Sequence, residues 1–222
     1  LYGEEQAADL LRNTVVAVIG PVTGDAVTQL GVKVMIQPKT YTVPAMGEKG
    51  SETWGDLIDY GGGAAWLSGT FDPALNTLYW ATGNPWPDYN GDVRKGDNLY
   101  TCSLLALDLD TGKMKWHFQF TPHDTHDWDG VETPVLIDGE INGQKRKLVA
   151  QASRNGYFFV LDRATGKNVV TTEFVKTNWA SHIDKTGRPI PNPAKEPQID
   201  GALVTPNQGG GTNWYPPSYS PD

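Results

Sequence analysis

The pattern of apolar and polar positions predicts a chain built mainly from short β-strands. In 31–37 apolar and polar side chains alternate, which is typical of a strand with one buried face. Other short apolar runs are bounded by Gly, Pro, Asn or Asp, residues that end strands. These runs lie at 14–20, 76–83, 100–110, 113–120, 133–153 and 156–163. Only 5–13 has a clear helical periodicity, so the pattern favours an all-β fold.

An internal repeat refines this prediction. The stretch "LLALDLDTGKMKWHF" (104–118) resembles "FFVLDRATGKNVVTTEF" (158–174), and 71–83 is a looser relative. The first two copies each read as a strand, a turn containing Thr-Gly-Lys, and a second strand. In that turn Asp and Thr side chains stabilise the backbone and Gly accepts a positive φ. Units that recur after about fifty residues predict the four-stranded antiparallel blades of a β-propeller. The Pro-, Asn-, Lys- and Gly-rich stretch 176–212 predicts a long surface excursion.

The length of the chain predicts an incomplete propeller. A chain of 222 residues accommodates only about four such units, and an open ring leaves blade edges exposed. The first residues include neither an initiator Met nor the basic region of a signal peptide. We therefore expect a mature protein or, in preference, a fragment of a longer polypeptide.

Composition and charge exclude several classes of partner. The formal net charge of −8 and the pI near 4.9 argue against binding to nucleic acid or to an anionic membrane. No run of about 18 apolar residues occurs, so no membrane span is expected. Cys102 is the only cysteine, which excludes a disulfide within the chain.

The densest polar segment is "HDTHDWDGVE" at 123–132. It gathers two imidazoles and four carboxylates, which are His123, His126, Asp124, Asp127, Asp129 and Glu132. In an extended segment residues i and i+2 point the same way, so Asp127 and Asp129 would converge and favour a hard cation with oxygen ligands. The alternative is a solvated acidic turn. His123 and His126 suggest zinc, but no further ligands follow at the spacing of a zinc finger.

Three other stretches carry candidate ligand contacts. Asn84, in "ATGNPWPDYN", offers an amide oxygen to a cation, or is an ordinary turn residue. Trp66, in "GGGAAWLSG", is either a flat platform for a planar ring or a packing residue between blades. Asn213 and Trp214 follow three glycines in a stretch that either faces a ligand or forms a plain loop.

Together these motifs resemble the quinoprotein alcohol dehydrogenases, which hold pyrroloquinoline quinone (PQQ) in an eight-bladed β-propeller. The resemblance is clear over 41–222, and the whole chain, 1–222, would be part of that propeller domain. The motifs that carry it are "TVPAMGEKGSETWGD", "GGGAAW", "LYWATGNP", "GDNLYTCSLLALDLDTGKMKWHFQFTPHDTHDWDG", "ASRNGYFFVLDRATGK" and "GGTNWYPPSYSPD".

The resemblance implies roles for individual residues. Those that would bind PQQ are Trp66 as the platform, Arg154 as the donor to the quinone oxygens, and Asn213 with its neighbour Trp214. Those that would bind the metal are Asn84, Asp127, Asp129 and Gln29, with Asp127 also acting as general base. His123, Asp124 and His126 would support the turn around them. An Asp at position 129 is the mark of lanthanide-dependent members, whereas calcium-dependent methanol dehydrogenases have a small residue there.

The chain also departs from the family pattern. Gln29, in "TQLGVK", stands where members have a glutamate metal ligand, which removes one negative charge. Ala64 stands where many members have a threonine that contacts PQQ, and the vicinal cysteine pair is absent.

The implied activity is oxidation of a primary alcohol, such as methanol or ethanol, to the aldehyde by hydride transfer to metal-bound PQQ. The metal would be a lanthanide ion, or alternatively Ca²⁺, and the electrons would pass to a cytochrome c in the periplasm. A homodimer is left open. Two alternatives remain: a non-catalytic propeller module that has lost the cofactor, and a calcium- or sugar-binding propeller with no redox role.

Overall fold

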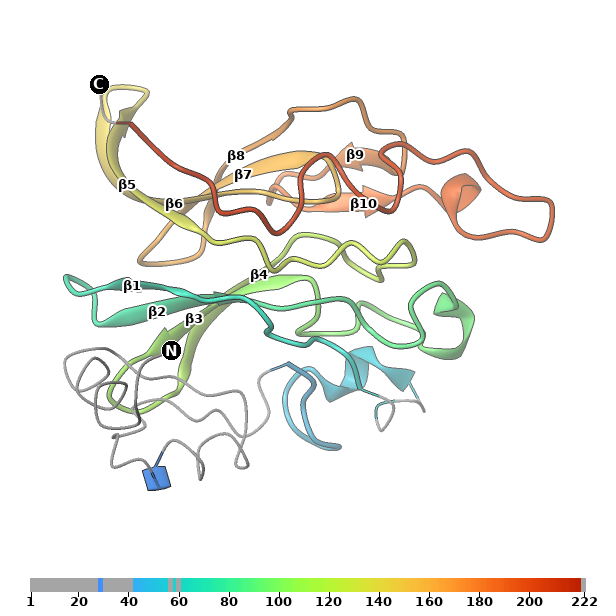
Figure 1. Cartoon of the computed structure of the whole chain (residues 1–222), viewed down its shortest axis with the longest axis horizontal. Coiled ribbons are helices and arrows are strands. Elements are labelled where there is room, and N and C mark those ends of the chain that lie inside the picture. Colours follow the sequence, from blue (N-terminus) through green and yellow to red (C-terminus); the bar gives the residue numbers. More distant parts are fainter. Residues whose placement is uncertain (1–27, 30–41, 56–57, 59–60, 221–222) are drawn as a thin grey trace, which may run out of the picture.

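The computed structural model describes residues 28–29, 42–55, 58 and 61–220. Two four-stranded antiparallel sheets pack against each other, and a two-stranded hairpin lies beside the second sheet (Figure 1). In each four-stranded sheet the strands are neighbours in the order in which they follow along the chain. This is the arrangement of two propeller blades, so the prediction of an all-β propeller, present here as part of a ring, is confirmed.

The elements have the following bounds. The first sheet contains β1 (Thr70–Asp72), β2 (Thr77–Ala81), β3 (Ser103–Asp108) and β4 (Met114–Gln119). The second contains β5 (Val135–Ile141), β6 (Gln144–Ala152), β7 (Tyr157–Asp162) and β8 (Asn168–Glu173). The hairpin contains β9 (Ala180–Ile183) and β10 (Pro189–Pro191), and the short 3-10 helices are η1 (Ser51–Thr53), η3 (Gly91–Val93) and η4 (Pro193–Lys195).

The strands agree with the apolar runs wherever the structure describes them. The runs at 76–83, 100–110, 113–120 and 156–163 each contain one strand. The run at 133–153 contains two, β5 and β6, because a turn with positive φ at Asn142 and Gly143 separates them. The predicted helix at 5–13 and the predicted strands at 14–20 and 31–37 lie outside the described residues.

The excursion at 176–212 has more regular structure than its composition predicts. It includes the β9–β10 hairpin and η4, where the side chain of Asn192 caps the helix by accepting from the Ala194 main-chain N–H. Trp179 is buried, and its indole donates to the Asn155 carbonyl at 2.7 Å. The excursion is therefore anchored to the second sheet at its start.

The two repeated turns are built alike. In the first, Asp108 Oδ1 accepts from the Thr111 N–H at 3.0 Å and from the Thr111 hydroxyl at 2.8 Å. In the second, Asp162 Oδ1 accepts from the Thr165 N–H and hydroxyl at the same distances. The glycine that follows has a positive φ in both turns, of 67° and 72°. The repeat in the sequence is thus a repeat of turn chemistry.

The main core lies between the two sheets. It includes Tyr79 and Leu104 from the first sheet, Phe159 from the second, and the buried rings of Trp128 and Trp179. Burying each such side chain stabilises the fold by about 1.5–3 kcal/mol. This core holds the two sheets in a fixed position relative to each other.

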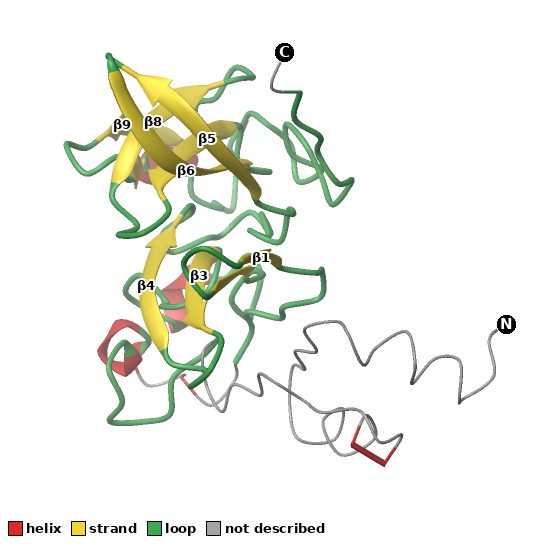
Figure 2. Ribbon diagram, turned by 90° about the vertical axis from the view of Figure 1, so that its left-hand side faces the viewer, coloured by secondary structure: helices red, strands yellow, loops and turns green. Residues whose placement is uncertain are grey.

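One connection lies between the two sheets and positions the polar segment. The chain from 120 to 134 leaves β4, runs along the junction and enters β5 (Figure 1). The view in Figure 2 shows the same two layers from the side, with β3 and β4 in one and β5 and β6 in the other. Side chains of 123–132 can therefore reach loops from both blades.

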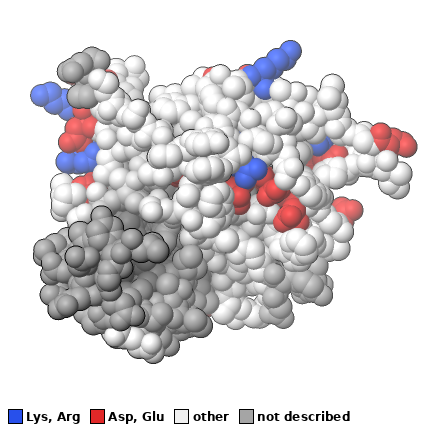
Figure 3. All heavy atoms as spheres, viewed as in Figure 1, with Lys and Arg blue, Asp and Glu red and all other residues white. Residues whose placement is uncertain are grey.

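The charged side chains are distributed over the surface. On the described part of the face in Figure 3, Lys and Arg side chains are scattered and do not gather into a patch. None of the helices in the described residues has the length and apolar character needed to cross a bilayer.

Candidate functional site

Asp124 shapes the polar segment at the junction between the sheets. Its buried carboxylate accepts from the main-chain N–H groups of His126 at 3.2 Å and Trp128 at 3.1 Å. Burial raises the pKa of Asp124 to about 7, although these hydrogen bonds lower it. Asp124 therefore stabilises the turn, as the resemblance implies.

The two histidines of the segment are also bound to the scaffold. The His123 Nδ1 lies 2.6 Å from the Gly96 carbonyl oxygen. The His126 ring stacks on Trp128 with the ring centroids 4.4 Å apart, and its Nε2 lies 3.1 Å from the Lys195 carbonyl oxygen. Among the described residues no group of three His, Cys, Asp or Glu side chains could hold a metal ion. The structure therefore gives no support to a zinc site.

The predicted extended geometry at Asp127 is wrong. Asp127 has a φ of 60°, in the left-handed region, because the hydrogen bonds to Asp124 fold the segment into a turn. Its carboxylate accepts from the Gln208 side chain at 2.6 Å, whereas the Asp129 carboxylate has other partners. The two carboxylates still interact electrostatically, and the negative charge of Asp127 raises the pKa of Asp129.

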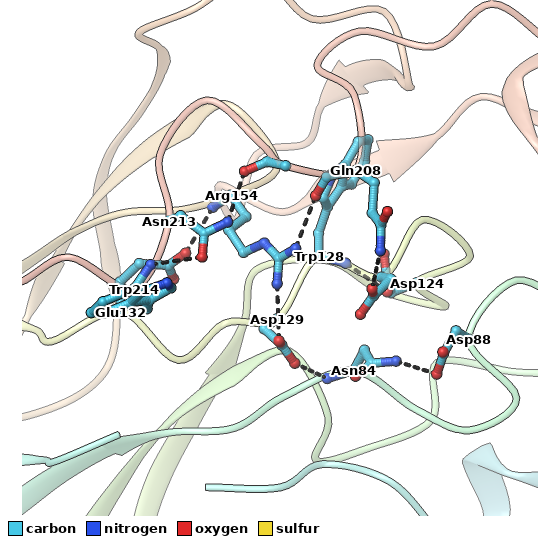
Figure 4. A network of polar contacts seen from close by, with 12 residues as sticks. Asn84, Asp88, Asp124, Trp128, Asp129, Glu132, Arg154, Gln208, Asn213 and Trp214 are labelled. Carbon is cyan, nitrogen blue, oxygen red and sulfur yellow. Dashed lines mark hydrogen bonds and ion pairs between the residues drawn. The ribbon is translucent and has the colours of Figure 1, made fainter. Parts of the chain in front are cut away.

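Asp129 lies at the centre of the polar contacts in Figure 4. Its Oδ1 accepts from the Asn84 main-chain N–H at 2.9 Å, and its Oδ2 pairs with Arg154 Nη1 at 2.9 Å. Burial raises the pKa of Asp129, and its contacts with Asn84, Arg154 and Trp66 lower it. Gly83 allows this approach, because a Cβ at position 83 would lie 2.5 Å from Asp129 Oδ1.

Arg154 lies on the turn between β6 and β7 and is buried. Its Nη2 donates to the Gln208 carbonyl oxygen at 2.9 Å, in addition to the pairing of Nη1 with Asp129. Its main-chain N–H donates to Glu132 Oε1 at 3.2 Å. Its Nε is buried and has no hydrogen-bond partner among the described residues. A buried donor without a partner indicates that the site accommodates a further acceptor.

The candidate aromatic platforms are accessible. Trp66 is 44% exposed, and its side chain is close enough to Asp129 to lower the pKa of that carboxyl. Trp214 is 47% exposed and stacks on Tyr215. Asn213 donates to the Gly209 carbonyl oxygen at 3.0 Å, so its position depends on the Gly-rich turn before it.

Gln29 is not joined to this group in the described structure. It is exposed and lies in a two-residue helical stretch between residues that are not described. Among the described residues no hydrogen bond links Gln29 to Asn84, Asp127 or Asp129. Its predicted role as a metal ligand stays a prediction.

Sequence reasoning missed three residues of the site. Gln208 contacts both Asp127 and Arg154, and Asp88 accepts from the Asn84 side-chain amide at 2.7 Å. Glu132 accepts from the Arg154 N–H and from the Gln151 amide, and its burial raises its pKa to about 8. For Asp88 and Glu132 the available signal is that they lie in the polar motifs of Asn84 and Asp129.

A sequence model described as the β-propeller domain of PQQ-linked glucose, ethanol and alcohol dehydrogenases matches residues 40–198. The chain belongs to this family. The match spans both four-stranded sheets and includes Asn84, Asp127, Asp129 and Arg154. Asn213 and Trp214 lie beyond it.

Relatives of this chain include quinoprotein, quinohemoprotein and europium-containing enzymes. Quinoprotein alcohol dehydrogenase PedH from Pseudomonas putida is 45% identical over 185 residues, which cover 79% of this chain and 31% of PedH. A structure of a europium-containing methanol dehydrogenase matches with a TM-score of 0.74 and 36% identity, over 85% of this chain and 34% of that one. The structure of quinohemoprotein alcohol dehydrogenase from Comamonas testosteroni matches with a TM-score of 0.72 and 43% identity. The match covers 78% of this chain and 27% of that one.

The chain thus spans about a third of the length of these relatives. The donors in this part of the propeller fit the family's metal and cofactor. Asn84, Asp127 and Asp129 supply amide and carboxylate oxygens, which are the ligands of hard cations. The unpartnered Arg154 Nε supplies a buried donor for an oxygen of a quinone.

Proposed function

We propose that the full-length protein containing this chain oxidises a primary alcohol, such as methanol or ethanol, to the aldehyde. Its cofactors are PQQ and a lanthanide ion, with Ca²⁺ as the alternative ion. Its electrons pass to a cytochrome c in the periplasm. The membership of the PQQ dehydrogenase family supports alcohol oxidation, and the finer assignments rest on the site residues.

The observation that carries the proposal is the position of Asp129. Its carboxylate lies between the Asn84 loop and Arg154, and the exposed Trp66 ring is beside it. A carboxylate that is mostly buried requires positive charge nearby. Without an ion, Arg154 supplies that positive charge. A trivalent ion would compete with Arg154 for the Asp129 carboxylate.

The residues of the chain have separate tasks in this proposal. Asn84, Asp127, Asp129 and Gln29 hold the ion. Trp66, Arg154, Asn213 and Trp214 hold PQQ. When bound, the quinone supplies the hydride acceptor and the ion supplies Lewis acidity. Asp127 accepts the hydroxyl proton of the alcohol, because it is a partly exposed carboxylate at the edge of the site.

The test uses the full-length protein, freed of metal and reconstituted with PQQ. It is titrated separately with La³⁺ and Ca²⁺, and dye-linked oxidation of methanol and ethanol is followed. We expect activity with La³⁺ that is lost in the Asp129→Ala variant. A Glu140→Ala variant, which changes an exposed carboxylate on β5, is the matched control and should keep the wild-type activity.

Other outcomes would change the assignment. Activity with Ca²⁺ alone would retain the dehydrogenase and remove the lanthanide assignment. Absence of both PQQ uptake and activity would favour a non-catalytic propeller, which Gln29 and Ala64 already favour in part because they replace a metal ligand and a PQQ contact of the family.

A further inference from the structure

The side-chain amide of Asn84 has a defined orientation. Its Nδ2 donates to Asp88 Oδ1 at 2.7 Å and to the Pro85 carbonyl oxygen at 3.2 Å. Both partners are acceptors only, so the flipped amide would place an oxygen against two oxygens. Asn84 Oδ1 is therefore the free end of the amide, and no hydrogen bond to it occurs among the described residues.

Asp88 is itself held in place from the protein interior. Arg94 is fully buried, and it donates through Nε to the Pro87 carbonyl at 3.0 Å and through Nη2 to the Asp88 carbonyl at 3.1 Å. The same Nη2 donates to the Asp124 carbonyl. Arg94 thus ties the loop that carries Asp88 to the segment that carries Asp127 and Asp129. The main chain at Asp88 is therefore fixed to the buried part of the protein.

The Asn84 residue lies between two carboxylates, as Figure 4 shows. Its main-chain N–H binds Asp129, and its side-chain N–H groups bind Asp88 and Pro85. All the N–H donors of Asn84 are therefore engaged. Its side-chain oxygen, Oδ1, is left for another ligand. A carboxylate that orients a ligand from behind is a common feature of metal sites, and its removal weakens metal binding by about 10–100-fold.

We propose that Asp88 is a positioning residue that presents Asn84 Oδ1 to the metal ion. This inference rests on the proposed function, because it requires that the ion binds at Asn84, Asp127 and Asp129. Asp88 acts through the Asn84 amide and does not itself bind the ion. Its charge also favours a cation nearby, so orientation and charge must be separated in the test.

The test is a titration of the full-length, PQQ-reconstituted protein with Tb³⁺, followed by terbium luminescence sensitised by tryptophan. We expect Asp88→Ala to weaken Tb³⁺ binding by about 10–100-fold. Asp88→Asn should retain much of the affinity, because its amide oxygen still accepts from Asn84. Asp92→Ala is the matched control, since Asp92 is an exposed carboxylate in the neighbouring η3. Thermal melts check that each variant is folded.

Each other outcome is decisive. Wild-type affinity in Asp88→Ala would overturn the positioning role and leave the proposed function intact. Equal losses in Asp88→Ala and Asp88→Asn would show an effect of charge alone, which also overturns it. A wild-type protein that takes up PQQ but no Tb³⁺ would remove the lanthanide site of the proposed function, and the role of Asp88 with it.

Discussion

The side-chain amide of Gln208 donates a hydrogen bond to Asp127 Oδ2 at 2.6 Å, although the two residues are 81 positions apart. The main-chain carbonyl oxygen of Gln208 accepts from Arg154 Nη2 at 2.9 Å. Gln208 thus contacts both Asp127, the candidate general base, and Arg154, the candidate hydrogen-bond donor to PQQ. Because Asp127 has a positive φ, its orientation depends on such contacts more than on a regular strand.

Replacing Gln208 tests this dependence. We expect Gln208→Ala to lower kcat of the full-length enzyme by roughly 3- to 10-fold, because a partly exposed hydrogen bond to a charged group contributes about 1 kcal/mol. The value of KM should change less than kcat, because the Asp127 carboxylate is present but less well oriented. Steady-state kinetics with one alcohol measures both.

A second glutamine on the same excursion supplies the control for Gln208. Gln198 is exposed, and its amide donates to the Ala194 carbonyl at 3.1 Å, away from Asp127. Gln198→Ala should leave both constants unchanged. If the two glutamine variants behaved alike, the contact between Gln208 and Asp127 would have no role in turnover.

Gly83 provides a steric test of the centre of the site. A Cβ at position 83 would lie 2.5 Å from Asp129 Oδ1 and 3.0 Å from the Ala64 carbonyl oxygen. We therefore expect Gly83→Ala to lower the free energy of unfolding by about 1–3 kcal/mol and to weaken Tb³⁺ binding. Urea unfolding and terbium titration measure these effects. Gly139→Ala is the control, because its Cβ would meet nothing closer than 3.4 Å; a similar loss there would contradict the steric explanation.

The blades could be predicted from the sequence because their signals are local. Alternating apolar positions specify strands, and the Asp-x-x-Thr-Gly turns are closed by side chains only three residues apart. The β9–β10 hairpin was missed because it lies in a stretch rich in residues that end strands. Tertiary contacts stabilise it, including the buried Trp179 at its start.

The site was predictable in part. The family motifs assign Asn84, Asp129 and Arg154 to one site, and in the structure Asp129 contacts both of the others directly. The direction of Asp127 was wrong because hydrogen bonds to Asp124 override the extended geometry. Gln208 was missed because its contact with Asp127 depends on how distant loops meet, which no local pattern encodes.

Glu132 should make stability depend on pH. Burial raises its pKa from the ordinary value of 4.5 to about 8, so between these values the folded protein binds a proton that the unfolded chain does not. We therefore expect the free energy of unfolding to fall as the pH rises from about 4.5 to about 8. The buried Asp124, with its pKa raised to about 7, adds a fall of the same sign.

The Glu132→Gln variant isolates this effect. It keeps an acceptor for the Arg154 N–H but cannot ionise, so its stability should fall less steeply over the same pH range. Urea unfolding at several pH values, followed by tryptophan fluorescence, gives the slopes. Glu140→Gln changes an exposed carboxylate on β5 and should keep the wild-type slope. Parallel slopes for wild type and Glu132→Gln would show that Glu132 does not hold its proton in the folded state.

The contact between the two sheets includes an ion pair that should be sensitive to loss of one partner. Arg163 Nε pairs with Asp72 Oδ2 at 2.6 Å, and the two side chains are only 6% and 2% exposed. Asp72 ends β1 and Arg163 follows β7, so the pair joins the two blades. We expect Asp72→Ala to lower the free energy of unfolding by about 3–5 kcal/mol, because the buried guanidinium loses its buried carboxylate and keeps a pair with the exposed Asp138 at 2.7 Å.

The control variants separate the buried charge from simple loss of contact. The double variant Asp72→Leu with Arg163→Met removes both charges and should cost less than Asp72→Ala, because no unpaired charge remains buried. Lys147→Ala breaks a pair with Asp138 in which both side chains are largely exposed, and should cost less than about 1 kcal/mol. Denaturant unfolding measures all three. If the double variant were the least stable of them, the ion pair itself would stabilise the junction between the blades, beyond the cost of leaving one charge alone.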